Sequence, residues 1–254
     1  MKTDRLSEIL RDLTENYGAI GVKAEFEAEG ARFSDVEILS EIVSREKSRL
    51  FVKIGGAEAV TDLFAAKDLA ASGIIVPMVE SPFALEKFRG AALRVYGEDP
   101  SVSFTANIES VSGVKQADAI LKNARGLLSC VTVGRVDLAA SYGLSRADIE
   151  NGKMNRAAGK VIALAKKYGL TAGIGGGITE KTPEVVRRFG GAVDQVETRK
   201  IVLPAFGIDL KKALLIATQF EEAWLSALLE THGLDAYDEN RLQLLKKRIG
   251  ELVL

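Results

Sequence analysis

Strand-like and helix-like segments alternate along most of this 254-residue chain. Short runs rich in β-branched and other apolar residues recur about every 22–30 residues, with one longer gap before residue 170. In the intervals, apolar residues repeat at helical spacing. This alternation predicts successive strand–helix units, because parallel strands are joined by crossovers that are usually helices. The expected strands are residues 19–26, 50–54, 74–79, 102–109, 127–133, 170–174 and 192–203, and the expected helices are residues 4–15, 35–46, 57–71, 83–91, 114–124, 153–168 and 182–189.

Seven strand candidates in one series favour an α/β fold of the (β/α)8 TIM-barrel type over a doubly wound sheet. The eighth strand is not obvious, so the barrel is either incomplete or uses its last long strand segment irregularly. Beyond residue 204 the pattern changes to two long helices, 208–231 and 239–253. We therefore expect a barrel domain over residues 1–206. A helical extension over residues 207–254 would pack on the barrel or be exchanged between the subunits of a homo-oligomer.

The composition is that of an ordinary globular protein, with 47% hydrophobic and 27% charged residues. A net charge of −1 gives no electrostatic reason to expect nucleic acid or an anionic membrane as a partner. The only cysteine, Cys130, excludes an internal disulfide and lies in an apolar strand segment, where a structural thiol is expected. The chain has no run of about 18 apolar residues, and its amino terminus does not resemble a signal peptide. We therefore expect a cytoplasmic protein.

Two acidic residues, Glu109 and Asp137, each follow a β-branched apolar run and lie one strand–helix unit apart. A right-handed crossover would bring both carboxylates to the carboxyl ends of neighbouring strands, about 4.8 Å apart. Two oxygens on one octahedral Mg²⁺ must come within about 3 Å of each other, which two short acidic side chains can achieve. Hard oxygen ligands favour Mg²⁺ or Mn²⁺. The pair therefore predicts a divalent-metal site.

Several motifs resemble the citrate lyase β-subunit-like superfamily of phosphoenolpyruvate/pyruvate-type barrels, which also holds the HpcH/HpaI-type metal-dependent aldolases. The similarity extends over residues 19 to 200 approximately. It rests on Val-Lys-Ile-Gly-Gly-Ala-Glu-Ala at 52–59, Ile-Ile-Val-Pro-Met-Val-Glu-Ser at 74–81, Ala-Leu-Glu-Lys-Phe at 84–88, Ala-Asn-Ile-Glu-Ser at 106–110 with Gly113, and Val-Gly-Arg-Val-Asp-Leu-Ala-Ala-Ser-Tyr-Gly at 133–143.

This resemblance implies a (β/α)8 barrel, a Mg²⁺ or Mn²⁺ ion held by Glu109 and Asp137, and chemistry through a metal-bound enolate. Breaking a carbon–carbon bond beside a carbonyl generates a carbanion, and a divalent ion can stabilise its charge by several kcal/mol. The basic residue of the family, usually an arginine, falls on Lys53. A lysine could supply a second positive charge, but it lacks the bidentate fork of an arginine. A Schiff-base lysine is an alternative that would make the metal superfluous.

The histidine base that 2-oxo-acid aldolases of this superfamily carry after an early strand is absent. The only histidine, His232, lies at an expected helix end, where a capping or exposed role is favoured over catalysis. Carboxylates could serve instead, because Glu25 and Glu27 alternate with the apolar residues of the first strand. Solvated loop charge is the competing interpretation for Glu27. Glu80, expected at the end of the third strand, is a further candidate for proton transfer or substrate binding.

Other polar residues are expected near the carboxyl ends of the strands. Asn107 lies on the same strand face as Glu109, so it could bind substrate, orient the metal ligand or make a structural amide bond. Arg135 could bind a substrate carboxylate or phosphate, or form a surface ion pair. Glu197 and Arg199 could line the last strand's mouth or form an internal ion pair.

A glycine-rich loop over residues 173–179 follows one strand and precedes a helix. Its backbone N–H groups, with those of Gly175 and Gly176 among them, could bind an anion. Glycine-rich turns also follow barrel strands without binding phosphate.

The residues together favour a metal-dependent carbon–carbon lyase or aldolase that acts through a metal-bound enolate of a small 2-oxo acid or related carboxylate. Glu109 and Asp137 would hold the ion, Lys53 would stabilise charge, and an acidic residue near Glu25 would act as the base. Because the usual arginine and histidine are missing, a non-catalytic barrel that binds a ligand or serves as a subunit is one alternative. A phosphate-ester enzyme that uses the 173–179 loop is another.

Overall fold

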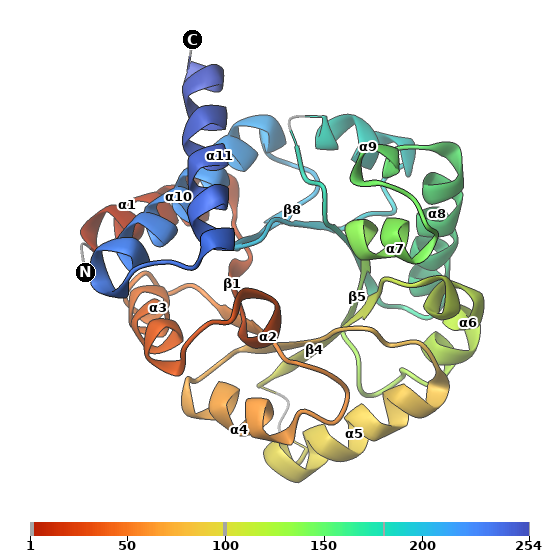
Figure 1. The fold of residues 1–254 in the computed structure, drawn as a ribbon. Coiled ribbons are helices and arrows are strands. Elements are labelled where there is room, and N and C mark those ends of the chain that lie inside the picture. Colours follow the sequence, from red (N-terminus) through yellow and green to blue (C-terminus); the bar gives the residue numbers. More distant parts are fainter. Residues whose placement is uncertain (1–2, 99–100, 180, 254) are drawn as a thin grey trace.

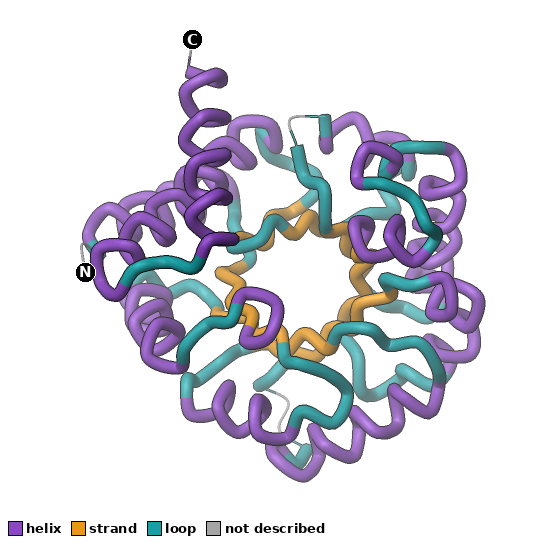
Figure 2. The backbone as a smooth tube through the Cα atoms, viewed as in Figure 1, coloured by secondary structure: helices purple, strands orange, loops and turns teal. Residues whose placement is uncertain are grey.

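The computed structural model describes residues 3–98, 101–179 and 181–253, which form a closed eight-stranded barrel ringed by helices (Figure 1, Figure 2). The strands are β1 (Gly21–Glu25), β2 (Leu50–Lys53), β3 (Gly73–Val76), β4 (Ser103–Ile108), β5 (Cys130–Gly134), β6 (Thr171–Gly175), β7 (Gln195–Glu197) and β8 (Ile201–Pro204). The helices are α1 (Asp4–Tyr17), α2 (Phe26–Glu29), α3 (Phe33–Arg45), α4 (Val60–Asp68), α5 (Pro82–Tyr96), α6 (Val111–Lys122), α7 (Arg135–Ser141), η1 (Arg146–Asp148), α8 (Gly152–Lys167), α9 (Thr182–Arg188), α10 (Leu210–His232) and α11 (Ala236–Val253).

The closure of the barrel departs from a regular (β/α)8 pattern in its last strand. The segment 192–203, expected as one long strand, contains a hairpin, because β8 runs antiparallel to both β7 and β1. The turn between β7 and β8 is closed by an N–H of Thr198 that donates to the carbonyl of Ile201 at 2.9 Å. This turn lies at the carboxyl end of β7. It therefore places Arg199 and Lys200 beside the mouth of the barrel.

At the amino-terminal end of the parallel strands, the barrel interior is filled by a small apolar cluster of Phe51, Ile75 and Val202. This cluster is separate from the main core between strands and helices. Two glycines make room for the Phe51 ring. A Cβ atom on Gly21 would lie 2.6 Å from a ring carbon of Phe51, and one on Gly73 would lie 2.4 Å from another. Because the ring fills the interior, only the opposite end, at the carboxyl ends of the parallel strands, remains open for a site.

The helical extension packs on the barrel through α10. The apolar face expected for this helix is buried, and its members are Leu210, Leu214, Ala217, Trp224 and Leu228. Arg5 of α1 donates to Glu222 of α10 at 2.9 Å. The next helix, α11, packs against α10 and extends outward past the ring of barrel helices (Figure 1). Within the described residues, we find no helix with the length and apolar character needed to span a membrane.

Candidate active site

The carboxyl ends of the parallel strands open into a cavity of about 680 Å³, which we call the mouth. Polar and charged side chains from five strands and the segments that follow them line it. They are Lys23 and Glu25 from β1, Lys53 from β2, Asn107 and Glu109 from β4 and the residue after it, Thr132 from β5, Asp137 from α7 and Glu197 from β7. The predicted acidic pair and Lys53 therefore face one cavity.

Glu109 is held rigidly in the mouth, with only 3% of its surface exposed. Its Oε1 accepts the backbone N–H of Met78 at 3.0 Å, and its Oε2 accepts from the Asn107 amide at 3.2 Å. The carboxylate lies directly against the end of β5, because a Cβ atom on Gly134 would be 2.2 Å from Oε2. Since β5 leads into α7, this contact brings Glu109 towards the segment that carries Asp137.

The environment of Glu109 disfavours an unbalanced negative charge. Burial raises the pKa of Glu109, and the neighbouring Asp137 carboxylate raises it further. The Lys53 ammonium and the Met78 N–H act in the opposite direction, but the net shift is upward. Asp137 lies in the first turn of α7 and is itself exposed in the mouth. A cation between the two carboxylates would relieve this electrostatic strain.

The donor set fits a hard divalent cation that keeps several positions for water and substrate. Among the described residues, no cluster of three or more acidic, histidine or cysteine side chains could enclose a metal. Glu109 and Asp137 both line the mouth and could be the two protein carboxylates of such an ion, since Mg²⁺ is usually bound by one or two. The Oδ1 of Asn107 is buried and has no hydrogen-bond partner in the described part of the chain. It offers one further oxygen next to Glu109.

Glu25 lies inside a buried chain of alternating charges. Its carboxylate pairs with Lys23 at 3.2 Å and with Lys53 at 3.7 Å, and Lys23 also contacts Glu197 at 3.4 Å. Burial alone would raise the pKa of Glu25, but the two ammonium groups outweigh it and lower the pKa to about 2. Burial likewise opposes the charge on Lys23, yet Glu25 and Glu197 raise its pKa above the ordinary value. An ionised, doubly paired Glu25 is a weak base.

Two predicted acidic residues lie outside the mouth. β1 ends at Glu25, so Glu27 falls in the short helix α2, where it is exposed and contributes nothing to the lining. β3 ends at Val76, and Met78 then adopts a left-handed conformation with φ of 51°. Glu80 follows this turn, is exposed, and is not among the residues that line the mouth. Glu27 and Glu80 do not line the mouth because both strands stop earlier than their apolar runs, and a part for either residue in the reaction stays a prediction.

Arg135 is a buried side chain that joins two segments at the mouth. Its side chain is 2% exposed and pairs with Glu150 at 2.8 Å. It also donates to the carbonyls of Gly176 at 2.8 Å and Gly177 at 3.2 Å. Burial lowers the pKa of Arg135, while Glu150 opposes that shift. The guanidinium therefore ties α7 to the loop after β6, and binding of a substrate carboxylate or phosphate by Arg135 stays a prediction.

The glycine-rich loop lies in the wall of the mouth, where Gly175, Gly176 and Gly177 contribute to the lining. Gly176 and Gly177 have φ of 72° and 60°, which favours glycine. A Cβ atom on Gly177 would lie 2.0 Å from the Ile149 side chain. Close packing and the contacts with Arg135 account for these glycines, and anion binding by the loop stays a prediction.

Some residues of the mouth were missed or left open at the sequence level. Lys23 was missed, although a lysine in the middle of an apolar strand, two residues before Glu25, is a usable signal. Thr132 was also missed, and its hydroxyl donates to Glu197 at 2.5 Å. For Glu197 the sequence left open a place in the mouth or an internal ion pair. The structure shows both, because Glu197 lines the mouth and pairs with Lys23. His232 lies outside the mouth at the end of α10, where one ring nitrogen contacts Asp35 at 3.0 Å.

The closed barrel with a polar, acid-containing site at the carboxyl ends of its strands is the arrangement of a TIM-type barrel enzyme. Residues 24–180 match the sequence profile described as HpcH/HpaI aldolase/citrate lyase. The chain therefore belongs to the HpcH/HpaI aldolase/citrate lyase family. No curated protein matches the chain at a significant level.

Solved structures with the same fold include two proteins of that family. The chain is 21% identical to an HpcH/HpaI aldolase/citrate lyase family protein from Burkholderia cenocepacia J2315, with a TM-score of 0.63 and 90% of each chain covered. It is 18% identical to an HpcH/HpaI aldolase from Desulfitobacterium hafniense DCB-2, with a TM-score of 0.63 and coverage of 76% and 80%. A citrate synthase variant is 18% identical, with a TM-score of 0.60 and coverage of 89% and 88%.

Proposed function

We propose that this protein is a metal-dependent carbon–carbon lyase or aldolase that acts on a small 2-oxo acid or a related carboxylate. Membership of the family supports the reaction class. The observation that carries the proposal is the arrangement of Glu109 and Asp137, which come from successive strand–helix units and face one cavity beside Lys53. Such a constellation suits a reaction in which negative charge develops on a substrate oxygen.

Glu109 and Asp137 would hold Mg²⁺ or Mn²⁺. When bound, the ion supplies positive charge where the substrate develops enolate character. The hydrogen bonds from Met78 and Asn107 fix the Glu109 carboxylate before any ligand arrives. A pre-positioned carboxylate needs little reorganisation on binding, which favours a defined geometry.

Lys53 is the cation best placed to meet the substrate. Its ammonium lies 3.7 Å from Glu25 and acts electrostatically on Glu109, so it stands between the charge network and the acidic pair. It would bind a substrate carboxylate as a point charge. Glu25, itself paired with Lys23, then positions the Lys53 side chain. Because Glu25 is ionised and doubly paired, we assign it to positioning rather than to proton transfer.

We also propose that the extension serves assembly with further copies of the chain. In α11, Leu244 is 61% exposed although it is a large apolar residue on a helix that packs against α10. Exposed apolar side chains on a projecting helix favour an interface. A homo-oligomer would cover this face.

A ligand-binding barrel without catalysis is the second candidate. The observation that favours it is the buried ion-pair network of Lys23, Glu25, Lys53 and Glu197, which engages Glu25, the acid expected as the base, in a lining that contains no histidine among the described residues. No contact in the described residues favours the phosphate-ester alternative.

Exchange of the methyl protons of pyruvate in heavy water separates the two candidates. An enzyme of the proposed class should catalyse this exchange with Mg²⁺ or Mn²⁺, because enolate formation precedes addition to any acceptor. The exchange can be followed by proton NMR without knowing the second substrate. Glu109→Gln and Asp137→Asn should abolish the exchange, and Asp118→Asn, which changes an exposed acid on α6, should leave it intact. Metal binding without exchange of any small 2-oxo acid would favour the ligand-binding barrel.

A further inference from the structure

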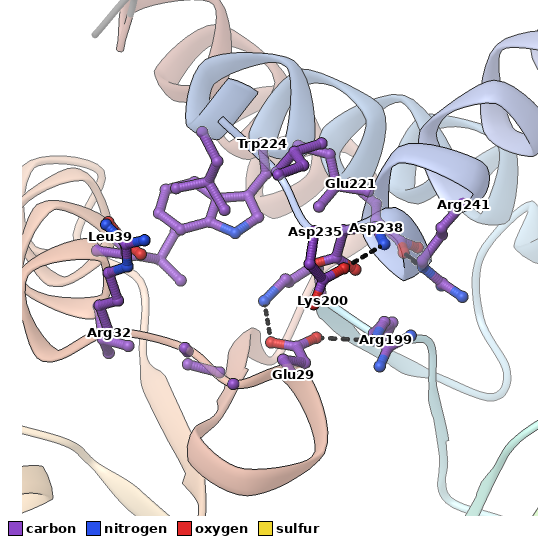
Figure 3. A pocket seen from close by; sticks show the side chains of 18 of the residues that line it. Glu29, Arg32, Leu39, Arg199, Lys200, Glu221, Trp224, Asp235, Asp238 and Arg241 are labelled. Carbon is purple, nitrogen blue, oxygen red and sulfur yellow. Dashed lines mark hydrogen bonds and ion pairs between the residues drawn. The ribbon is translucent and has the colours of Figure 1, made fainter. Parts of the chain in front are cut away.

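A second cavity of about 340 Å³ lies beside the mouth, between α3 and the helices α10 and α11 (Figure 3). We call it the side cavity. One wall is apolar and consists of Val36, Leu39, Trp224, Leu225 and Leu228. The volume is within the range of small-molecule sites, which combine an apolar wall with a few placed polar groups. The side cavity shares a wall with the mouth, because Arg199, Glu221 and Arg241 line both.

Trp224 presents an unused hydrogen-bond donor to the side cavity. It is the only tryptophan of the chain and is 3% exposed. Within the part of the chain that the structure describes, its indole N–H donates to no acceptor, and the nitrogen is not among the fully buried polar atoms without a partner, so it is accessible from the cavity. Figure 3 shows the indole nitrogen on the side of the ring that faces the cavity, towards Lys200 and Glu29. A ligand oxygen here would satisfy this donor.

Lys200 adds positive charge at the same place. Its ammonium lies 5.7 Å from the centre of the Trp224 ring, and the residue is 4% exposed. Among the described residues, the ammonium has one carboxylate partner, Glu29, which it shares with Arg199. An ammonium carries three N–H groups, so Lys200 retains donors for a further acceptor. Trp224 and Lys200 together suit the carboxylate of a ligand.

Acidic residues line another part of the side cavity. Asp235 and Asp238 both contribute to the lining, and neither forms an ion pair with a described cationic side chain. Asp235 caps α11 by accepting the backbone N–H of Asp238 at 2.8 Å. Burial and the charge of Asp235 raise the pKa of Asp238, and this outweighs the opposite influence of Arg199 and Lys200. A ligand ammonium would be favoured there.

We propose that the side cavity binds a small α-amino acid with a branched apolar side chain. Its carboxylate would meet Trp224 and Lys200, and its ammonium would meet Asp235 and Asp238. Its side chain would lie on the apolar wall near Leu39 and the two leucines of α10. A ligand with both charges matches a cavity that offers donors and acidic groups together. This site does not depend on the reaction proposed for the mouth.

The test uses the full-length protein and L-leucine as the probe. Because Trp224 is the only tryptophan, its intrinsic fluorescence reports directly on the side cavity. Two comparison compounds each remove one charge: 4-methylpentanoate lacks the amine, and 3-methylbutylamine lacks the carboxylate. Leucine should give a saturable fluorescence change and calorimetric heat, and each comparison compound should bind at least tenfold more weakly. Absence of saturable binding by leucine, or equal binding of all three compounds, would overturn the proposal.

Two variants and one control make the assignment specific. Asp238→Asn should weaken leucine binding at least fivefold and leave 4-methylpentanoate unaffected, because only the ammonium contact is lost. Trp224→Phe keeps an apolar ring but removes the N–H, so it should weaken both compounds in calorimetry. Glu37→Gln changes an exposed acid on α3 outside the cavity and should bind leucine as wild type does. If Asp238→Asn is poorly folded by circular dichroism, Asp235→Asn keeps a capping oxygen and replaces it. Unchanged leucine affinity in the folded variant would contradict the proposed ammonium contact.

Discussion

The carboxylate of Glu109 occupies the space that a side chain on Gly134 would need. A Cβ atom on Gly134 would lie 2.2 Å from the Glu109 Oε2 and 2.8 Å from its Cβ. The backbone of Gly134 has φ of −80°, which any residue adopts, so the requirement for glycine is purely steric. This close approach fixes Glu109 against the strand that leads into the Asp137 helix.

Gly134→Ala should displace Glu109 and disturb the acidic pair. Over-packing of this kind costs about 1–3 kcal/mol of the free energy of unfolding. The variant should also lose most of the stabilisation by Mn²⁺, since its carboxylates no longer converge. Urea unfolding with and without Mn²⁺ measures both effects. Gly90→Ala is the matched control, because a Cβ on Gly90 in α5 meets nothing within 4 Å and should be neutral or slightly stabilising. Unchanged Mn²⁺ stabilisation in Gly134→Ala would show that the pair does not form the metal site.

Glu109→Gln should change the free energy of unfolding in opposite directions with and without a divalent ion. Burial and Asp137 raise the pKa of Glu109, so its ionised form is disfavoured in the folded protein. A carboxyl whose folded pKa is raised contributes stability at low pH that is lost as the pH rises through that pKa. At neutral pH without metal, the Glu109→Gln protein should therefore be at least as stable as wild type, with a gain of at most about 1 kcal/mol in the free energy of unfolding.

With saturating Mn²⁺ the order should reverse. At an ion concentration about a hundred times Kd, wild type gains about 2.7 kcal/mol, which corresponds to a rise in Tm of about 5–10 °C. Glu109→Gln should gain little. Differential scanning calorimetry at several Mn²⁺ concentrations gives both comparisons. An equal rise in Tm for wild type and variant would refute the role of Glu109 as a metal ligand.

Much of the barrel could be predicted from the sequence because each strand is a compact apolar run bounded by turn-forming residues. The exception is the segment 192–203, where a hairpin replaces a strand–helix unit. Apolar periodicity does not report strand direction, so the antiparallel β8 could not be predicted. The turn of this hairpin carries Arg199, which lines both cavities, and Lys200, which lines the side cavity.

The site could be predicted where side chains follow strands directly, and not where the chain turns early. Glu109 and Asp137 fell in one cavity because each follows its strand closely. Glu27 and Glu80 were misplaced because β1 and β3 end before their apolar runs do. The role of Arg135 depends on Glu150 and on carbonyls about 40 residues away, contacts that no local pattern reveals.

The low pKa of Glu25 should make the protein sensitive to acid. A carboxyl whose folded pKa is depressed contributes stability above its unfolded pKa, and this stability is lost as the pH falls through the folded pKa. For Glu25 the pKa falls from an ordinary value of 4.5 to about 2 in the folded protein. The difference corresponds to about 3 kcal/mol, which should disappear between pH 5 and pH 2 approximately. Urea unfolding at a series of pH values measures it.

Glu25→Gln should remove that acid sensitivity and destabilise the protein at neutral pH. Lys23 and Lys53 would each lose a carboxylate partner, and breaking one side of a buried ion pair costs about 3–5 kcal/mol. Glu27→Gln is the control, since Glu27 is exposed on the adjacent helix and should leave the pH profile unchanged. An acid-unfolding profile of Glu25→Gln that matches wild type would show that the ion pairs contribute nothing to acid stability.

Arg135→Met should destabilise the protein more than the replacement of an exposed arginine would. The side chain supplies donors to Glu150 and to two carbonyls of the glycine loop, and a methionine of similar length leaves all of them unpaired. A buried network broken in this way costs about 3–5 kcal/mol. Amide hydrogen exchange should increase in residues 175–177 and in α7 before it does elsewhere, because Arg135 joins those two segments. Arg146→Met removes an exposed arginine of the mouth and should alter neither stability nor exchange by more than about 0.5 kcal/mol. Wild-type exchange rates around residues 175–177 in Arg135→Met would show that the loop holds its conformation without Arg135.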